Sequence, residues 1–167
     1  MEVETQRSEG MKKVADLLKD LRVCMLVSQD DSGHLVGRPM SALHMDTDGS
    51  IRFFTNGTSS KTEQLDNINL TFINSADADY VSISGKGELE FDRAMIAALW
   101  TPAAEPWFPE GMDDPELAIL RVDVKTAEVW DADNSTMIRI IAMAAAAVTG
   151  KPNATLQEEH ALIHNDA

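Results

Sequence analysis

The stretch Phe53–Leu65 reads FFTNGTSSKTEQL and joins the end of an apolar strand to a turn and the start of a helix. The turn is rich in glycine and hydroxyl-bearing residues. Ser60 then precedes Glu63 by three positions, which is the spacing of a capping box at a helix N-terminus. The sequence therefore predicts a helix over 60–66 that points out of the turn.

The N-terminus of this predicted helix is suited to binding an anion. Backbone N–H groups in the first turn of a helix have no partner within it, and they carry a partial positive charge. Lys61 adds an ammonium group, while Thr55, Ser59 and Ser60 add hydroxyl groups. The segment fits a phosphate cradle, and it equally fits an ordinary capped helix without a ligand.

The preceding strand contains a second unusual segment, Gly37–Ser41, which reads GRPMS. Proline cannot donate to a β-ladder, so it is confined to edges, strand starts and bulges. We therefore expect the strand to be interrupted at Pro39, leaving unpaired backbone beside Arg38. That backbone could bind the polar edge of a planar ligand while the guanidinium binds its phosphate. Alternatively, Arg38 is a surface residue of an edge strand.

Short apolar runs separated by turn clusters recur along the chain and predict about six antiparallel strands. The expected strands cover 22–28, 35–45, 51–55, 70–74, 80–91 and 117–130. Gly85 and Gly87 in the fifth run suit a bulge or a barrel corner. This pattern favours a mainly β fold, an antiparallel barrel with peripheral helices, over a βαβ dinucleotide-binding fold.

Amphipathic or capped segments around these strands predict the helices, and no linker divides the chain. Helices are expected over 8–21, 93–100, 135–148 and, unless the end is frayed, 155–164. The expectation is one domain over residues 1–167, with its core at about 12–141 and a C-terminal helical segment at about 135–167.

The composition excludes several classes of partner. The 167 residues carry 28 acidic and 14 basic side chains, a net charge of −14, which disfavours nucleic acids and anionic membranes. Any anionic ligand then needs locally concentrated Arg, Lys and backbone N–H groups. The single cysteine, Cys24, lies in an apolar run and indicates a buried thiol. With an acidic N-terminus and no long apolar run, the chain is expected to be cytoplasmic.

Histidine spacing gives little support for a metal site. The four histidines are scattered, and only His160 and His164 share a helical i, i+4 spacing. That pair is better explained as a solvated helix face, so no metal is expected. No Ser-His-Asp order or CxxC motif is present either.

Taken together, Arg38–Ser41, Phe53–Asn56 and Ser60-Lys61 resemble the FMN-binding signature of the pyridoxamine 5'-phosphate oxidase-like split-barrel flavoproteins. Trp107–Gly111, followed by Asp114-Pro115, is similar to an element of the bacterial general stress protein branch. The resemblance implies a six-stranded Greek-key split barrel. It also implies a homodimer with FMN at the subunit interface.

The resemblance further implies roles for individual residues. Arg38 and Lys61 would hold the FMN phosphate, and Pro39 to Ser41 would lie along the isoalloxazine ring. Trp107 would cover the ring, or would plug a loop or the dimer core instead. The cofactor-binding residues implied are Arg38, Pro39, Met40, Ser41, Phe54, Thr55, Ser59, Ser60, Lys61 and Trp107.

Departures from the family pattern argue against activity on pyridoxamine 5'-phosphate. Leu43 replaces a flavin-contacting lysine, and Tyr80 replaces a glutamine. The acidic segment 131–137 replaces an Arg- and His-containing substrate-phosphate site.

The expected function is an FMN-binding general stress protein acting as a flavin-dependent oxidoreductase with a small-molecule electron donor or acceptor. The alternatives are a non-catalytic protein that binds or sequesters FMN, and a related cofactor such as deazaflavin or haem. No catalytic residue is assigned.

Overall fold

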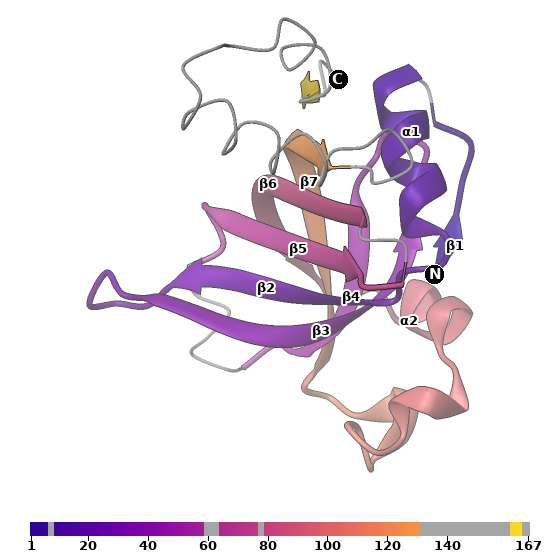
Figure 1. Ribbon diagram of the computed structural model, residues 1–167. Helices are drawn as coiled ribbons and strands as arrows, with labels where there is room; N and C mark the ends of the chain where they lie inside the picture. Colours follow the sequence, from indigo (N-terminus) through magenta and orange to yellow (C-terminus); the bar gives the residue numbers. More distant parts are fainter. Residues whose placement is uncertain (7–8, 59–63, 77–78, 131–160, 165–167) are drawn as a thin grey trace, which may run out of the picture.

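The computed structural model describes residues 1–6, 9–58, 64–76, 79–130 and 161–164. Six of its strands form a closed antiparallel barrel (Figure 1). Their order around the barrel is β3-β2-β5-β6-β7-β4, and β4 pairs back with β3 to close it. The predicted mainly β split-barrel fold is confirmed. The strands are β2 (Val23–Gln29), β3 (Leu35–Met45), β4 (Ile51–Asn56), β5 (Ile68–Asn74), β6 (Asp79–Glu90) and β7 (Leu117–Trp130).

The barrel interior is filled by the inward-facing residues of these strands. Leu26, Phe53, Phe72 and Ile83 are all fully buried. The helix α1 (Glu9–Leu18) adds Met11, Val14, Ala15 and Leu18 to the same core, because its apolar residues recur at helical spacing. Alternation of inward and outward residues along each strand therefore sets which side chains remain for a site on the outer surface.

Strand β3 differs from the expectation at Pro39. The strand runs without interruption through Leu35–Met45, and Pro39 lies opposite Met25 of β2. Proline fits there because β4 pairs only with the last part of β3, at Ala42–Met45. The irregularity lies further along the strand, as a bulge between Ala42 and His44.

The bulge expected at Gly85 and Gly87 of β6 is confirmed. The register between β6 and β7 shifts between Ser84 and Gly85. A Cβ atom on Gly85 would lie 2.4 Å from the carbonyl oxygen of Asp123, which is too close for any side chain. The glycine thus allows two backbones to approach at this bulge.

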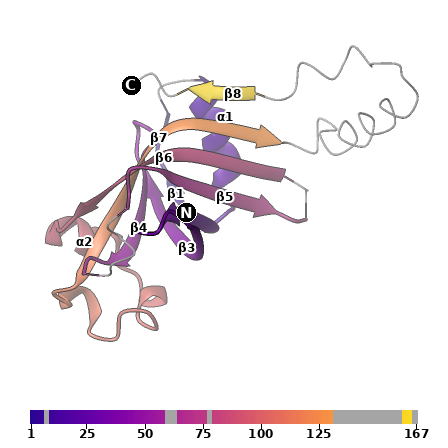
Figure 2. The same cartoon turned by 90° about the vertical axis from the view of Figure 1, so that its left-hand side faces the viewer.

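A short helix and the loop that follows it pack on the outer surface beside β4 and β7 (Figure 2). The helix α2 (Arg93–Leu99) begins after Asp92, whose carboxylate accepts from the N–H groups of Ala94 and Met95. Two short 3-10 turns follow, η2 (Pro102–Ala104) and η3 (Gly111–Asp113). Ile96 of α2 is buried against Phe54 and strand β7, forming a second apolar cluster outside the barrel.

Two short strands at the chain ends were not expected. β1 (Glu2–Val3) pairs in parallel with β3, and β8 (Ala161–His164) pairs antiparallel with β7. The prediction of a terminal helix is therefore wrong at 161–164, because hydrogen bonding to the edge of β7 overrides the capping pattern. None of the helices in the described parts of the chain has the length and apolar character needed to cross a bilayer.

The remaining helix predictions are only partly within the described residues. Gln64–Asp66, the end of the helix expected at 60–66, is not helical. The start of that helix at 60–63, the helix at 135–148 and the segment 155–160 lie outside the described residues.

Candidate cofactor-binding site

A pocket of about 660 Å³ lies on the outer surface of the barrel, between β3, the end of β4 and the loop that follows α2. Its volume is in the range of small-molecule and cofactor sites. Its lining consists of Val23, Arg38, Pro39, Met40, Ser41, Leu43, Phe54, Thr55, Asn56, Thr101, Ala103, Ala104, Trp107 and Phe108.

One wall of the pocket is the part of β3 that pairs on one side only. Leu35–Ser41 pairs with β2, whereas the pairing with β4 begins at Ala42. No other strand within the described residues lies against that edge of Arg38–Ser41. Backbone N–H and C=O groups on an open strand edge are available to a ligand, as they are in peptide-binding sheets.

Arg38 supplies positive charge to this wall. Its side chain is half-buried and donates a hydrogen bond to the Ser28 hydroxyl at 3.3 Å. Burial lowers the pKa of the Arg38 guanidinium from its ordinary value, although an arginine in a protein still remains protonated. A half-buried guanidinium is less well hydrated than an exposed one, so it gains more from an anionic partner.

The end of β4 forms the opposite wall, and its turn is held in place by hydrogen bonds. The side-chain Oδ1 of Asn56 accepts from the Thr58 N–H at 2.9 Å, and the side-chain Nδ2 of Asn56 donates to the Glu116 carboxylate at 2.8 Å. The Gly57 N–H donates to the Glu116 carbonyl at 2.7 Å. Thr55 and Asn56, which line the pocket, therefore have a fixed position.

Aromatic residues close the third side. The Phe54 ring lies 5.7 Å from Trp100 and 6.0 Å, edge-on, from Phe108, measured between ring centroids. These contacts hold the loop after α2 against β4. Trp107 lies on the same loop, lines the pocket and is 79% exposed. Its ring is free to cover a ligand or to contact a partner.

Arg93 fixes the far part of this loop. Its guanidinium donates to the carbonyl oxygens of Met112, Asp114 and Pro115 at 3.4, 2.9 and 3.2 Å. Three acceptors on one planar guanidinium restrict the loop to a narrow set of conformations. The loop that carries Trp107 is therefore anchored at Phe108 and again at the 112–115 segment.

The structure brings together most of the predicted site residues. Those in the pocket wall are Arg38, Pro39, Met40, Ser41, Phe54, Thr55 and Trp107. Ser59, Ser60 and Lys61 lie outside the described residues, so their role stays a prediction. Lining residues that the sequence did not single out as ligands are Val23, Leu43, Asn56, Thr101, Ala103, Ala104 and Phe108. Of these, Leu43, Asn56 and Phe108 stood at positions or in segments that the family pattern had already marked.

The chain matches the model of a known protein family over most of its length. A model described as "Pyridoxamine 5'-phosphate oxidase like" matches residues 9–153. The chain belongs to the pyridoxamine 5'-phosphate oxidase-like family. The match covers the whole barrel, both walls of the pocket and the loop after α2.

Individual relatives of the family agree with this assignment. Protein bli-3 of Neurospora crassa is 25% identical over 165 residues, which cover 91% of this chain and 79% of that protein. The general stress FMN/FAD binding protein from Xanthomonas citri is 33% identical, with a TM-score of 0.60 over 72% of this chain and 87% of that one. The General Stress Protein 26 from Bacillus anthracis shares the fold, with a TM-score of 0.64 at 17% identity, over 73% of this chain and 94% of that one.

The pocket combines an apolar surface with an open strand edge and one cation. Its lining is mostly apolar, which fits a planar ring system, and the open edge of β3 offers donors and acceptors for a polar ring edge. Arg38 offers a cation for a phosphate. Leu43 keeps its part of the wall apolar. Tyr80 does not line the pocket; it lies on β6, opposite Trp130.

Proposed function

We propose that the chain binds FMN in this pocket and acts as a flavin-dependent oxidoreductase. The observation that supports this most is the position of Arg38, Pro39, Met40 and Ser41 on an open strand edge that faces Phe54. The similarity to an FMN/FAD binding protein that is 33% identical adds support. FMN would supply the electron-transfer chemistry, which no side chain of the pocket can provide.

The residues of the pocket would bind and orient the cofactor. Arg38, together with Lys61, would bind the phosphate dianion through charge-assisted hydrogen bonds. Backbone groups of Met40 and Ser41 would contact the polar edge of the isoalloxazine ring. Phe54 and the loop carrying Trp107 would limit the access of water to the ring and leave one face for an electron donor or acceptor.

The side chains that line the pocket favour a reaction that needs no protein acid or base, such as electron or hydride transfer. Its polar side chains are Arg38, Ser41, Thr55, Asn56 and Thr101, and none of these titrates near neutral pH. Within the described residues, the pocket wall thus offers no general acid or base. This observation also favours the second candidate function, a non-catalytic protein that binds or sequesters FMN.

Activity as a pyridoxamine 5'-phosphate oxidase is not proposed. Leu43 contributes no charge to the wall where the oxidase has a lysine, and residues 131–137 are acidic where the oxidase binds its substrate phosphate. We expect no oxidase turnover on pyridoxamine 5'-phosphate. Rapid reduction of the bound flavin by NADH or NADPH, followed by reoxidation with an added acceptor, would favour the oxidoreductase over the binder.

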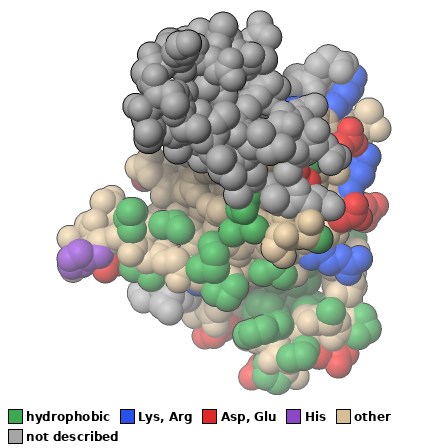
Figure 3. Space-filling model, in the orientation of Figure 1, with side chains coloured by type: hydrophobic (Ala, Val, Ile, Leu, Met, Phe, Trp, Pro, Cys, Tyr) green, Lys and Arg blue, Asp and Glu red, His purple; other side chains and the backbone are tan. Residues whose placement is uncertain are grey.

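We further propose that two copies of the chain form a dimer around this site. Val23 and Met25 of β2 and Ile73 of β5 are 60%, 42% and 52% exposed. Figure 3 shows hydrophobic side chains gathered over β2, β3 and β5 on one face. Val23 also lines the pocket, so this apolar face is continuous with it.

A reducing compartment is proposed for the protein. Cys24 is buried in the barrel core, and burial raises the pKa of its thiol to about 12. A buried, protonated thiol is a poor nucleophile and forms no disulfide within a chain that has one cysteine. This supports the cytoplasmic location expected from the sequence.

Titration of the apo-protein with FMN and with riboflavin tests the proposed binding mode. Riboflavin lacks the phosphate, so the comparison isolates the contact assigned to Arg38. Replacement of Arg38 with Ala should weaken FMN binding about 10- to 150-fold, since a hydrogen bond to a charged group contributes about 1.5–3 kcal/mol. Riboflavin affinity should change little.

Lys125→Ala is the matched control, because it removes an exposed positive charge from β7, away from the pocket lining. Flavin fluorescence quenching measures each affinity. Equal FMN affinity for the wild type and Arg38→Ala would contradict the proposed phosphate contact. Failure of the wild type to bind either flavin would reject the proposed function.

A further inference from the structure

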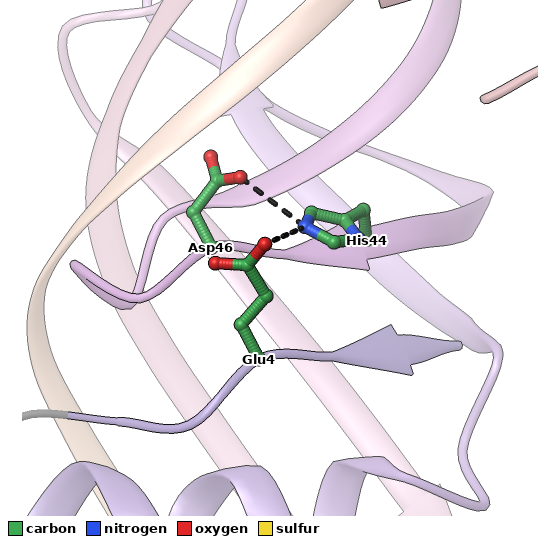
Figure 4. Close-up of side chains that lie close together, drawn as sticks. All are labelled: Glu4, His44 and Asp46. Atoms are coloured by element: carbon green, nitrogen blue, oxygen red, sulfur yellow. Dashed lines mark ion pairs between the residues drawn. The ribbon is translucent and has the colours of Figure 1, made fainter. Parts of the chain in front are cut away.

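A second polar cluster lies away from the pocket, where the N-terminal strand meets the end of β3. It consists of Glu4, His44 and Asp46 (Figure 4). The His44 Nε2 atom lies 3.5 Å from Glu4 Oε1 and 3.3 Å from Asp46 Oδ1. His44 is only 9% exposed, so its ring is held between two carboxylates in a largely water-free position.

The two distances suit a shared metal ion better than direct hydrogen bonds. A charge-assisted N–H···O bond is usually about 2.7–2.9 Å long. Zn²⁺ binds nitrogen and oxygen ligands at about 2.0–2.2 Å, and the edge of a tetrahedron is about 1.63 times its centre-to-corner distance. The expected ligand–ligand separation is therefore about 3.3–3.6 Å, and both observed distances fall in this range.

Each carboxylate has one oxygen fixed by other groups and the second directed toward His44. Asp46 Oδ2 accepts from Arg52 Nε at 2.8 Å and from the Ser50 hydroxyl at 2.9 Å. Glu4 Oε2 accepts from the Thr47 N–H at 3.1 Å. Such outer contacts are what hold metal ligands in orientation.

The other ring nitrogen of His44 provides an independent indication. Nδ1 is buried and has no hydrogen-bond partner among the described residues, although Glu2 Oε2 lies 3.8 Å away. If a metal occupies Nε2, the ring proton must sit on Nδ1, where it faces the Glu2 carboxylate. This is the carboxylate–histidine–metal arrangement found around most metal-binding histidines.

The backbone assembles these groups before any ion is present. Strand β1 places Glu2 directly opposite His44, and the Glu4 N–H donates to the Met45 carbonyl at 3.0 Å. The Gln6 amide donates to the carbonyls of Glu4 and Asp46 at 2.8 and 2.9 Å. Preorganised ligands lower the entropic cost of binding an ion.

We propose that Glu4, His44 and Asp46 form a Zn²⁺ site, each giving one ligand atom, with a fourth position for water. A neutral imidazole and two carboxylates balance the charge of the ion. Because Glu4 belongs to the N-terminal segment, while His44 lies near the end of β3 and Asp46 directly follows it, the ion would fasten that segment to the barrel. The site is separate from the flavin pocket and does not depend on the proposed function.

Calorimetric titration of untagged, chelator-treated protein with ZnCl₂ tests the proposal. One ion should bind per chain, and an equal concentration of Mg²⁺ should not compete. His44→Gln and Glu4→Gln should each weaken Zn²⁺ binding more than about 100-fold, and Glu2→Gln, which changes an outer contact, about 10-fold. At a free Zn²⁺ concentration of about 100 times Kd, the unfolded fraction of the wild type should fall about 100-fold.

His34→Gln is the matched control. His34 also lies near a carboxylate, with Nδ1 3.6 Å from Asp30 Oδ2, but the pair is exposed and the described part of the chain offers it no third ligand. This variant should bind Zn²⁺ as the wild type does. X-ray absorption of the Zn²⁺-loaded wild type should show nitrogen and oxygen neighbours at about 2.0–2.2 Å, a readout that does not depend on any variant folding.

Two outcomes would overturn the proposal. One is the absence of saturable Zn²⁺ binding by the wild type, which would make the cluster a set of polar side chains without a metal. The other is unchanged Zn²⁺ affinity in the folded Glu4→Gln variant. FMN affinity should be the same with and without chelator, so failure of the metal site leaves the flavin site untouched.

Discussion

Asp48 illustrates how a single residue couples the stability of this barrel to pH. Burial alone would raise the pKa of Asp48, but hydrogen bonds from Ser50 and the ion pair with Arg121 outweigh it, so the net pKa is lowered. The Ser50 N–H and hydroxyl donate to the carboxylate at 2.9 and 2.7 Å, and Arg121 Nη2 lies at 2.7 Å. The ionised form of Asp48 is therefore favoured by folding.

The Asp48→Asn variant should lose this pH-dependent contribution. A carboxyl whose pKa is lowered in the folded state stabilises the protein fully above the unfolded-state value of 3.8 and less as the pH falls below it. Because the side chain is 39% exposed, the expected loss at pH 7 is only about 1 kcal/mol. Urea unfolding should show this difference shrinking at about pH 3.

Asp66→Asn is the control for the general effect of removing a carboxylate. Asp66 pairs with Lys86 at 2.8 Å, but both side chains are well exposed, so its replacement should change stability little. A loss in Asp48→Asn that is the same at pH 7 and pH 3 would contradict the account of this ion pair.

At the scale of one element, strand β3 is shaped by its bulge. Ala42 lies opposite Phe53 and His44 lies opposite Arg52, so Leu43 is the extra residue. Ala42 and Met45 both face the core, although they are three positions apart, which regular alternation does not allow. The bulge thus directs Leu43 to the pocket wall and places His44 beside Asp46.

The bulge on β6 gives a prediction for the Gly85→Ala variant. The added Cβ would lie 2.4 Å from the Asp123 carbonyl oxygen, and neither backbone can move without breaking the β6–β7 ladder. The free energy of unfolding should fall by about 1–3 kcal/mol, the cost of forced overpacking. Thermal or urea unfolding of the purified variant measures it.

Gly37→Ala provides the comparison on β3. There the nearest atom to an added Cβ is the flexible end of the Met25 side chain, at 3.3 Å. That side chain can shift, so the stability of Gly37→Ala should remain within about 0.5 kcal/mol of the wild type. A stable Gly85→Ala protein would mean that β6 and β7 do not approach as described.

Local sequence patterns predict some parts of this structure, whereas parts formed by long-range pairing have no local signal. Apolar runs and turn clusters were enough to place the six barrel strands, and the family pattern pointed to most of the pocket wall. The sequence did not reveal β8, because pairing to an edge is a non-local interaction. Glu4 and His44 lie 40 positions apart and meet only through β1 pairing and the β3 bulge, so the second cluster had no local signal.

At the scale of the whole molecule, the apolar face over β2, β3 and β5 predicts self-association. Met25 lies opposite Pro39 of the pocket wall but does not itself line the pocket. Its replacement with Glu should place a charge in the proposed dimer interface and give a monomer of about half the wild-type mass. FMN affinity should fall with it, because the site is proposed to be shared between two subunits.

Sedimentation analysis of the Met25→Glu variant should be compared with Lys125→Glu. Lys125 is exposed on β7, which is not one of the three strands of the apolar face, so its replacement should leave a dimer intact. A wild type that sediments at the 18.3 kDa mass of a single chain would contradict the dimer proposal.

The charge of the pocket differs from the charge of the whole molecule. The chain carries a net charge of −14, yet Arg38 lines a pocket whose described walls contain no acidic side chain. A phosphate-bearing ligand would therefore meet a locally positive site on an otherwise acidic molecule. Added salt should weaken FMN binding less than it weakens exposed ion pairs, because Arg38 is half-buried.

A crystal structure of the protein with FMN tests the central claim most directly. The isoalloxazine ring should lie along the open edge of β3 at Pro39–Ser41, with the phosphate within hydrogen-bond distance of Arg38. Phe54 should lie on the opposite side of the pocket. FMN bound elsewhere, or a pocket that stays closed to FMN at saturating concentration, would contradict the account.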